Sequence, residues 1–141
     1  MAELIKVGAM QLRFLRTKYD TSGALDMFEV VIPPNSRMPV PHHHRDWEET
    51  IYGLEVSSLG RSLASESRSS REMIFSSRAV LSMGSSMRRR RLRKCSCVLT
   101  PGVLGPEFFR EMAVAIDGPA PPDPARMGEI MKRHGLIPAP S

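Results

Sequence analysis

Apolar and polar residues along the first third of the chain follow the pattern of β-strands. Residues 25–32 are rich in Phe, Val and Ile, which favours a strand. Residues 33–36 read Pro-Pro-Asn-Ser, a composition typical of a turn. Residues 47–54 carry Trp, Thr, Ile and Tyr and indicate a second strand. We therefore expect an N-terminal β region over residues 1–55.

The last third of the chain has a helical pattern. Residues 98–100 could form a short strand, and the apolar residues of segment 106–116 then recur at helical spacing. Residues 119–124 contain four prolines and are expected to form an extended linker. Residues 125–134 are a second helix candidate, with Gly135 placed as its C-terminal cap. The sequence thus predicts a β body followed by C-terminal helices.

The middle of the chain, residues 56–97, has a different composition. It holds thirteen of the sixteen serines and none of the prolines, and its apolar residues follow no steady period. It has ten basic and two acidic residues, a net charge of +8, whereas the rest of the chain sums to −3. We expect this stretch to be irregular, within one domain of residues 1–141 that continues through 98–118 and 119–141.

Length and composition exclude several classes of protein. A chain of 141 residues allows one domain with a real core, and its two cysteines cannot form a disulfide scaffold. No apolar run approaches the roughly 20 residues of a membrane span, and the N-terminus lacks the pattern of a secretory signal. These observations predict a cytoplasmic protein without a membrane partner.

The residues with metal-binding chemistry are concentrated in segment 41–55. In an extended chain His42 and His44 point to one face, and Glu49 is the natural carboxylate to join them. Two imidazoles and a carboxylate suit iron, and imidazole also suits zinc, copper or nickel. His43 should face away. The alternative is a surface histidine cluster that binds metal only adventitiously. The C-x-C pair in the central segment is a weak signal of a metal site on its own.

This segment resembles the first signature motif of the cupin family. That motif reads Gly, five residues, His-x-His, three or four residues, Glu, six residues, Gly, and His42, His44 and Glu49 match it. The flanking sequences resemble small bacterial single-domain cupins over roughly residues 8–55 and 98–138. The chain departs from the motif at Ser36 and Val56, where glycines belong.

The resemblance implies a fold, a metal and partners. The fold would be all-β, a cupin-like jelly-roll β-barrel with C-terminal helices. An intact relative would hold Fe, Mn, Ni, Zn or Cu with three histidines and one glutamate, of which His42, His44 and Glu49 are present here. Cupins include dioxygenases, isomerases and small-molecule binding modules, so catalysis stays open. A small-molecule ligand and a homodimer are the expected partners.

The second cupin motif, which supplies the remaining histidine ligand, is missing. It reads Gly, five residues, Pro-x-Gly, two residues, His, three residues, Asn, and it should lie within residues 56–97. That stretch contains no histidine and no proline. The barrel is therefore expected to be incomplete or distorted, and metal binding to be impaired.

The central segment resembles an out-of-frame translation of that second motif. In the shifted frame, each codon consists of the third base of one residue's codon and the first two bases of the next residue's codon. The junction of Ser82 and Met83 then permits His, and that of Met83 and Gly84 forces Gly. The other junctions permit the remaining motif residues at the right spacing. One frame slip near Glu55 and a compensating slip near Cys97 explain the segment, with a natural loop insertion as the alternative.

Two further functions are alternatives to a cupin-type metalloprotein. The run Arg88 to Arg91 could neutralise phosphates and bind nucleic acid without sequence specificity. No recognised nucleic-acid motif accompanies the run, and few aromatic residues are present for stacking, so nucleic acid is the less favoured partner. The other alternative is a structural remnant that neither holds metal nor catalyses a reaction.

Overall fold

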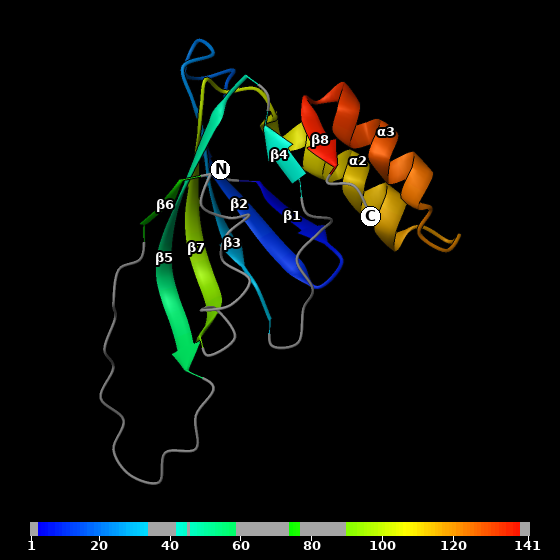
Figure 1. Cartoon of the computed structure of the whole chain (residues 1–141), viewed down its shortest axis with the longest axis horizontal. Helices are drawn as coiled ribbons and strands as arrows, with labels where there is room; N and C mark the ends of the chain where they lie inside the picture. The colour runs from blue at the N-terminus through cyan, green and yellow to red at the C-terminus, as the bar shows by residue number, and fades with distance from the viewer. Residues whose placement is uncertain (1–2, 34–41, 45, 59–73, 77–89, 139–141) are drawn as a thin grey trace, which may run out of the picture.

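The computed structural model describes residues 3–33, 42–44, 46–58, 74–76 and 90–138. Its strands are β1 (Leu4–Val7), β2 (Met10–Arg16), β3 (Asp26–Val31), β4 (His42–His44), β5 (Glu48–Ser58), β6 (Ile74–Ser76), β7 (Arg90–Thr100) and β8 (Leu136–Pro138). Its helices are α2 (Gly105–Asp117) and α3 (Pro124–Arg133). The fold is rich in β structure, with a sheet on one side and both helices on the other (Figure 1).

Six strands form one antiparallel sheet in the order β1-β2-β3-β7-β5-β6. The strand expected at residues 25–32 is confirmed as β3. Strands β1 and β2 were not predicted, although β2 alternates strictly: Leu12 and Phe14 are buried while Gln11 and Arg13 are exposed. Because side chains on a strand alternate between faces, this pattern places one face of the sheet in the core.

Strands β5 and β7 are longer than the sequence predicts. The expected strand at residues 98–100 is the end of an eleven-residue strand that begins at Arg90. The expectation that residues 56–97 are irregular is therefore wrong at both ends, where 56–58 continue β5 and 90–97 lie in β7, and also at 74–76, which form β6. Pairing on both sides, with β3 and with β5, holds β7 in the sheet. Residues 59–73 and 77–89 lie outside the described residues.

Both predicted helices are confirmed to within a residue. Helix α2 has a proline in its first turn, which helix geometry tolerates. Helix α3 begins at Pro124, so the linker ends one residue earlier than expected. The Asp123 carboxylate caps α3 by accepting a hydrogen bond of 2.9 Å from the Ala125 amide. After the helix, Gly135 adopts a positive φ of 80°, as a C-terminal cap requires.

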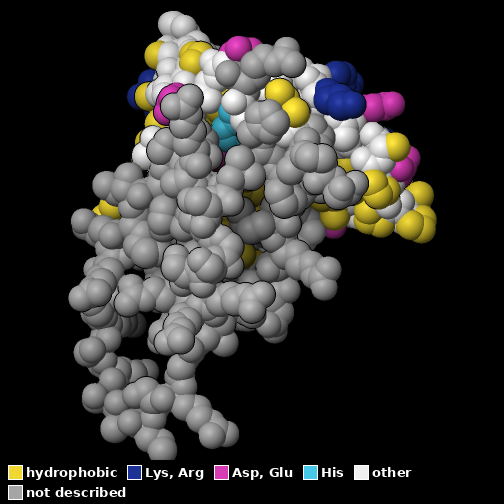
Figure 2. All heavy atoms as spheres, viewed as in Figure 1, with side chains coloured by type: hydrophobic (Ala, Val, Ile, Leu, Met, Phe, Trp, Pro, Cys, Tyr) yellow, Lys and Arg dark blue, Asp and Glu magenta, His cyan; other side chains and the backbone are white. Residues whose placement is uncertain are grey.

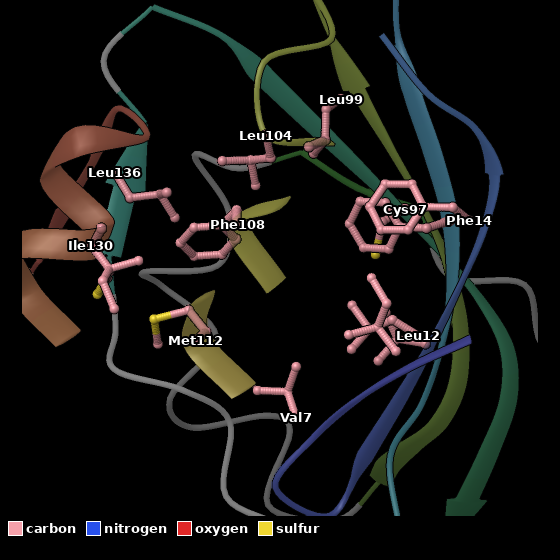
Figure 3. Packing of buried hydrophobic residues seen from close by; sticks show 14 of the residues in the cluster. Val7, Leu12, Phe14, Cys97, Leu99, Leu104, Phe108, Met112, Ile130 and Leu136 are labelled. Carbon is pink, nitrogen blue, oxygen red and sulfur yellow. The ribbon is translucent and has the colours of Figure 1, made fainter. Parts of the chain in front are cut away.

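The hydrophobic core lies between the inner face of the sheet and α2. Leu12 and Phe14 project from the sheet toward Phe108 and Met112 of the helix (Figure 3). Phe109 packs edge-on against Phe14, with ring centroids 5.7 Å apart. Edge-on aromatic pairs add a favourable electrostatic contact to the burial of apolar surface. The helix therefore covers the apolar face that the strand alternation creates.

Strand β8 pairs with β4, which brings the C-terminal segment beside the histidine-rich strand. In this antiparallel pair His44 lies opposite Leu136 and His42 opposite Pro138. Neither strand was predicted, because each has only three residues and the two strands lie far apart in the sequence. The strand pair lies beside the helices in Figure 1. It fixes the histidine strand at the helical end of the molecule.

Basic side chains at the helical end lie close to acidic ones. Arg133 forms an ion pair with Glu111, and Arg110 forms one with Glu3. Figure 2 shows basic, acidic and apolar side chains mixed in this region. Such pairing reduces the local excess of positive charge. Among the described residues, no helix is long and apolar enough to cross a membrane.

Candidate metal site

Of the three histidines in β4, His44 is the one whose side chain the structure describes. Its side chain is 4% exposed. The imidazole stacks on the indole of Trp47, with ring centroids 3.5 Å apart and planes 13° from parallel. Trp47 is itself buried, and pairing with β8 fixes the backbone of β4. The stacking on Trp47 and the paired backbone therefore both limit the movement of the His44 ring.

Glu49 lies beside His44. The distance from the His44 Nε2 atom to a Glu49 carboxylate oxygen is 3.6 Å, and the Glu49 side chain is 18% exposed. Glu49 is near the start of β5 and lies opposite Leu99 of β7, a fully buried residue. The structure thus brings together one histidine and the one glutamate that the sequence selects, on the core-facing side of the sheet.

His42 and His43 belong to the same short strand. The backbone of β4 is extended from His42 to His44. The side chains of His42 and His43 lie outside the described residues. The proposed role of His42 as a ligand stays a prediction.

Two thiols lie next to Glu49, and the sequence reasoning gave them little weight. Cys95 and Cys97 are buried on β7, with their sulfur atoms 3.9 Å apart. Ile51 lies opposite Cys97 in the register, which makes Glu49 the diagonal neighbour of Cys97. The C-x-C spacing was the available signal, but only the register shows that Glu49 lies on the same part of the sheet.

Burial affects the acidity of these groups. Burial raises the pKa of Glu49 to about 7, while the nearby Cys97 thiol acts in the opposite direction. The pKa of the Cys97 thiol is raised by its contact with Cys95, by burial and by the nearby carboxylate. Both groups are therefore less acidic than they are in water.

His44 and Glu49 form one close pair, and Cys95 and Cys97 form another. Among the side chains that the structure describes, no three of these ligand types converge on one point. Imidazole nitrogen, carboxylate oxygen and thiol sulfur are the donors that transition metals take in proteins.

The basic segment is only partly described. Arg88 and Arg89 of the tetra-arginine run lie outside the described residues, and Arg90 and Arg91 begin β7. Lys94, further along β7, lies 3.4 Å from the Glu29 carboxylate, which also pairs with Arg13. One of the ten basic groups of the central segment is thus part of an ion-pair cluster on the sheet.

No protein-family model matches the sequence, and no curated protein has a significant match to it. The class of the protein must therefore be argued from the site and the fold.

Proposed function

We propose that this chain is a metal-binding protein of the cupin type, with His42, His44 and Glu49 as ligands to one divalent transition metal. The proposal rests chiefly on the 3.6 Å separation of His44 and Glu49 on the inner side of the sheet. These residues were selected from sequence spacing alone, and they are five positions apart on two different strands. Their proximity is what a chelating pair requires.

The chain's own residues prepare such a site. Trp47 orients the imidazole of His44 by stacking, and the surrounding core limits the access of water. A well-positioned ligand loses less conformational freedom when a metal binds, which favours affinity. When bound, a divalent metal would act as a Lewis acid toward an oxygen atom of a small-molecule ligand. Isomerase and dioxygenase activities are both compatible with this chemistry.

We further propose that the sheet is a jelly-roll barrel left incomplete by a frame slip in residues 56–97. The long antiparallel strands β5 and β7, joined through that segment, support a barrel origin. The compensating slip is proposed near Cys97, at the end of that segment.

The nucleotide sequence of the homologous gene in close relatives tests the frame slip. The expected result is an uninterrupted reading frame that encodes the second cupin motif, shifted by one base relative to this chain. Relatives that encode the same Ser- and Arg-rich segment in one frame would refute the slip and favour a natural insertion. The metal site can be tested independently of that outcome.

The metal content of purified protein tests the proposed function. We expect roughly one transition-metal ion per chain after incubation with Fe²⁺, Mn²⁺, Ni²⁺, Zn²⁺ or Cu²⁺ in turn and removal of excess metal. His42→Ala, His44→Ala and Glu49→Gln should each reduce that content. His43→Ala is the matched control and should not. Equal metal content in His43→Ala and His44→Ala would show that binding is adventitious.

A further inference from the structure

We propose that Cys95 and Cys97 form a reversible redox pair, which a peroxide converts into an intramolecular disulfide within β7. The proposal goes beyond the metal site and does not depend on it. Its central observation is the distance of 3.9 Å between the two sulfur atoms, both of which belong to free thiols. The two groups that a disulfide would join therefore already lie side by side.

The strand geometry brings the two thiols to one face of the sheet. Side chains two positions apart on a strand point the same way, and both cysteines are buried. Figure 3 shows Cys97 on the core side of the sheet, beside Phe14. A rise of about 3.3 Å per residue separates Cα atoms two positions apart by about 6.6 Å. That separation lies near the upper end of the range that a disulfide spans, about 4.4–6.8 Å.

A disulfide at this spacing is expected to be easily reduced. Its formation must shorten the sulfur separation from 3.9 Å to about 2.05 Å, while pairing on both sides resists movement of the β7 backbone. Strained disulfides have higher reduction potentials and are the labile ones. The closed loop spans only residues 95–97, so the bond restricts the unfolded chain little. These properties are typical of a reversible switch rather than of a structural cross-link.

The sheet is irregular directly beside Cys95. Gly53 of β5 lies opposite Cys95, and the register then shifts, so that Glu55 lies opposite Lys94. A β-bulge of this kind interrupts the ladder of hydrogen bonds, and Gly53 adds no side chain next to that of Cys95. Buried groups become accessible through local openings of the native state. We therefore expect hydrogen peroxide, which is a small molecule, to reach the pair at this point.

The contact between the two sulfur atoms assigns the order of the steps. The hydrogen bond from the Cys97 thiol lowers the pKa of the Cys95 thiol, which favours its thiolate. The Cys95 thiolate attacks a peroxide oxygen, the O–O bond breaks, and a sulfenic acid and hydroxide form. The Cys97 sulfur then attacks the sulfenic sulfur, and the S–O bond breaks as the thiol proton leaves with the hydroxyl group as water. In total, two thiols lose two electrons and two protons, and one peroxide becomes two molecules of water.

Peroxide treatment of the reduced full-length chain, in a buffer that contains a metal chelator, tests the inference. The expected result is the loss of both thiols and of two hydrogen atoms from the intact mass, without added oxygen. Peptide mass spectrometry should then locate the bond between Cys95 and Cys97, and dithiothreitol should restore both thiols. The matched variant Cys97→Ser should instead yield a sulfenic acid at Cys95 that dimedone traps.

Several results would overturn the inference. Thiols that persist in the native chain but are oxidised in concentrated urea would show that burial excludes the oxidant. Disulfide-linked dimers, or sulfinic and sulfonic acids at both cysteines, would show that the two thiols do not react with each other. The wild-type mass is decisive even if Cys97→Ser fails to fold. Because metal is removed by the chelator, none of these outcomes bears on the proposed metal site.

Discussion

Asp26 shows how a buried acidic residue serves the fold rather than the site. It is fully buried, and its carboxylate accepts hydrogen bonds from the amides of Lys18, at 2.7 Å, and Gly105, at 3.1 Å. The first bond fixes the turn between β2 and β3, and the second fixes the start of α2. One side chain thus ties the sheet to the helix that covers it.

Replacement of this carboxylate should be costly. Asp26→Ala leaves two buried amides without their acceptor, which should reduce the free energy of unfolding by about 2–4 kcal/mol. Urea denaturation measures the change. Asp20→Ala is the control, because Asp20 also accepts hydrogen bonds in a turn but its side chain is 53% exposed. Equal losses in the two variants would contradict the anchoring role of Asp26.

Glu29 gives the fold a dependence on pH. Partial burial raises its pKa, but hydrogen bonds and charges from Arg13 and Lys94 outweigh this effect, so the pKa lies below its ordinary value of 4.5. A lowered pKa means that ionised Glu29 stabilises the folded state above the ordinary value. That contribution is lost as the pH falls through the lowered pKa.

The expected result is a smaller acid-induced loss of stability in Glu29→Gln than in the wild-type chain between pH 5 and pH 3. Urea midpoints measured across this range give the comparison. Glu48→Gln, at an exposed position on β5, serves as the control and should retain the wild-type slope. An unchanged slope in Glu29→Gln would show that the cluster with Arg13 and Lys94 contributes nothing.

The sequence selects His44 and Glu49, which lie 3.6 Å apart, but it does not indicate that Cys97 is near Glu49. The first pair follows a local spacing that a strand and a short turn translate into proximity. The diagonal relation of Cys97 to Glu49 depends instead on the register between β5 and β7, which are separated by the long central segment. Residue spacing carries no direct information on a register of that kind.

At the level of elements, the junction of α3 and β8 supports the histidine strand. Gly135 has a φ of 80°, and a Cβ atom added there would lie 3.5 Å from the Trp47 indole nitrogen. The backbone conformation is therefore unfavourable for any other residue. This glycine lets the chain turn from the helix into the strand that pairs with β4.

Two glycine substitutions should have opposite effects. Gly135→Ala forces a side chain into the left-handed region and should reduce the free energy of unfolding by about 1–2 kcal/mol. Gly128→Ala, in the interior of α3, meets no atom within 4 Å and should increase it by about 0.5–1 kcal/mol. Thermal unfolding of both variants provides the measurement. A loss of stability in Gly128→Ala would contradict the described packing of α3.

The two faces of β2 offer a second comparison. Leu12 is 2% exposed in the core, whereas Leu15, on the same strand, is 38% exposed. Leu12→Ala should cost about 2–5 kcal/mol through lost burial and a cavity. Leu15→Ala should cost less than about 1 kcal/mol. Equal costs, measured by urea denaturation, would mean that the sheet does not present the described face to α2.

The elements that the sequence predicts are those with strong local patterns. Strand β3 has a run of β-branched and aromatic residues, and α2 has apolar residues at helical spacing. Strand β8 has only three residues and is stabilised by its pairing with β4, so no local sequence pattern predicts it. The length of β7 exceeds the prediction because its one serine, its arginines and its cysteines have little strand propensity, and pairing on both sides stabilises it.

At the scale of the whole molecule, the net charge of the chain is a weak guide to its function. The net charge of +5 arises from the central segment, and Lys94 of that segment is paired with Glu29 on the sheet. The described portion of the chain is a β-rich fold with a candidate metal site on its inner side. The net charge alone therefore does not identify an anionic partner such as nucleic acid.

The zinc affinities of His44→Ala and His43→Ala, measured by competition with a chromophoric chelator, test the metal site most directly. The two residues are adjacent on β4, so both variants perturb the same strand. We predict that His44→Ala raises the zinc dissociation constant at least about tenfold, while His43→Ala leaves it within about twofold of the wild-type value. Equal dissociation constants in the two variants, or no zinc binding by the wild-type chain, would contradict the proposed site.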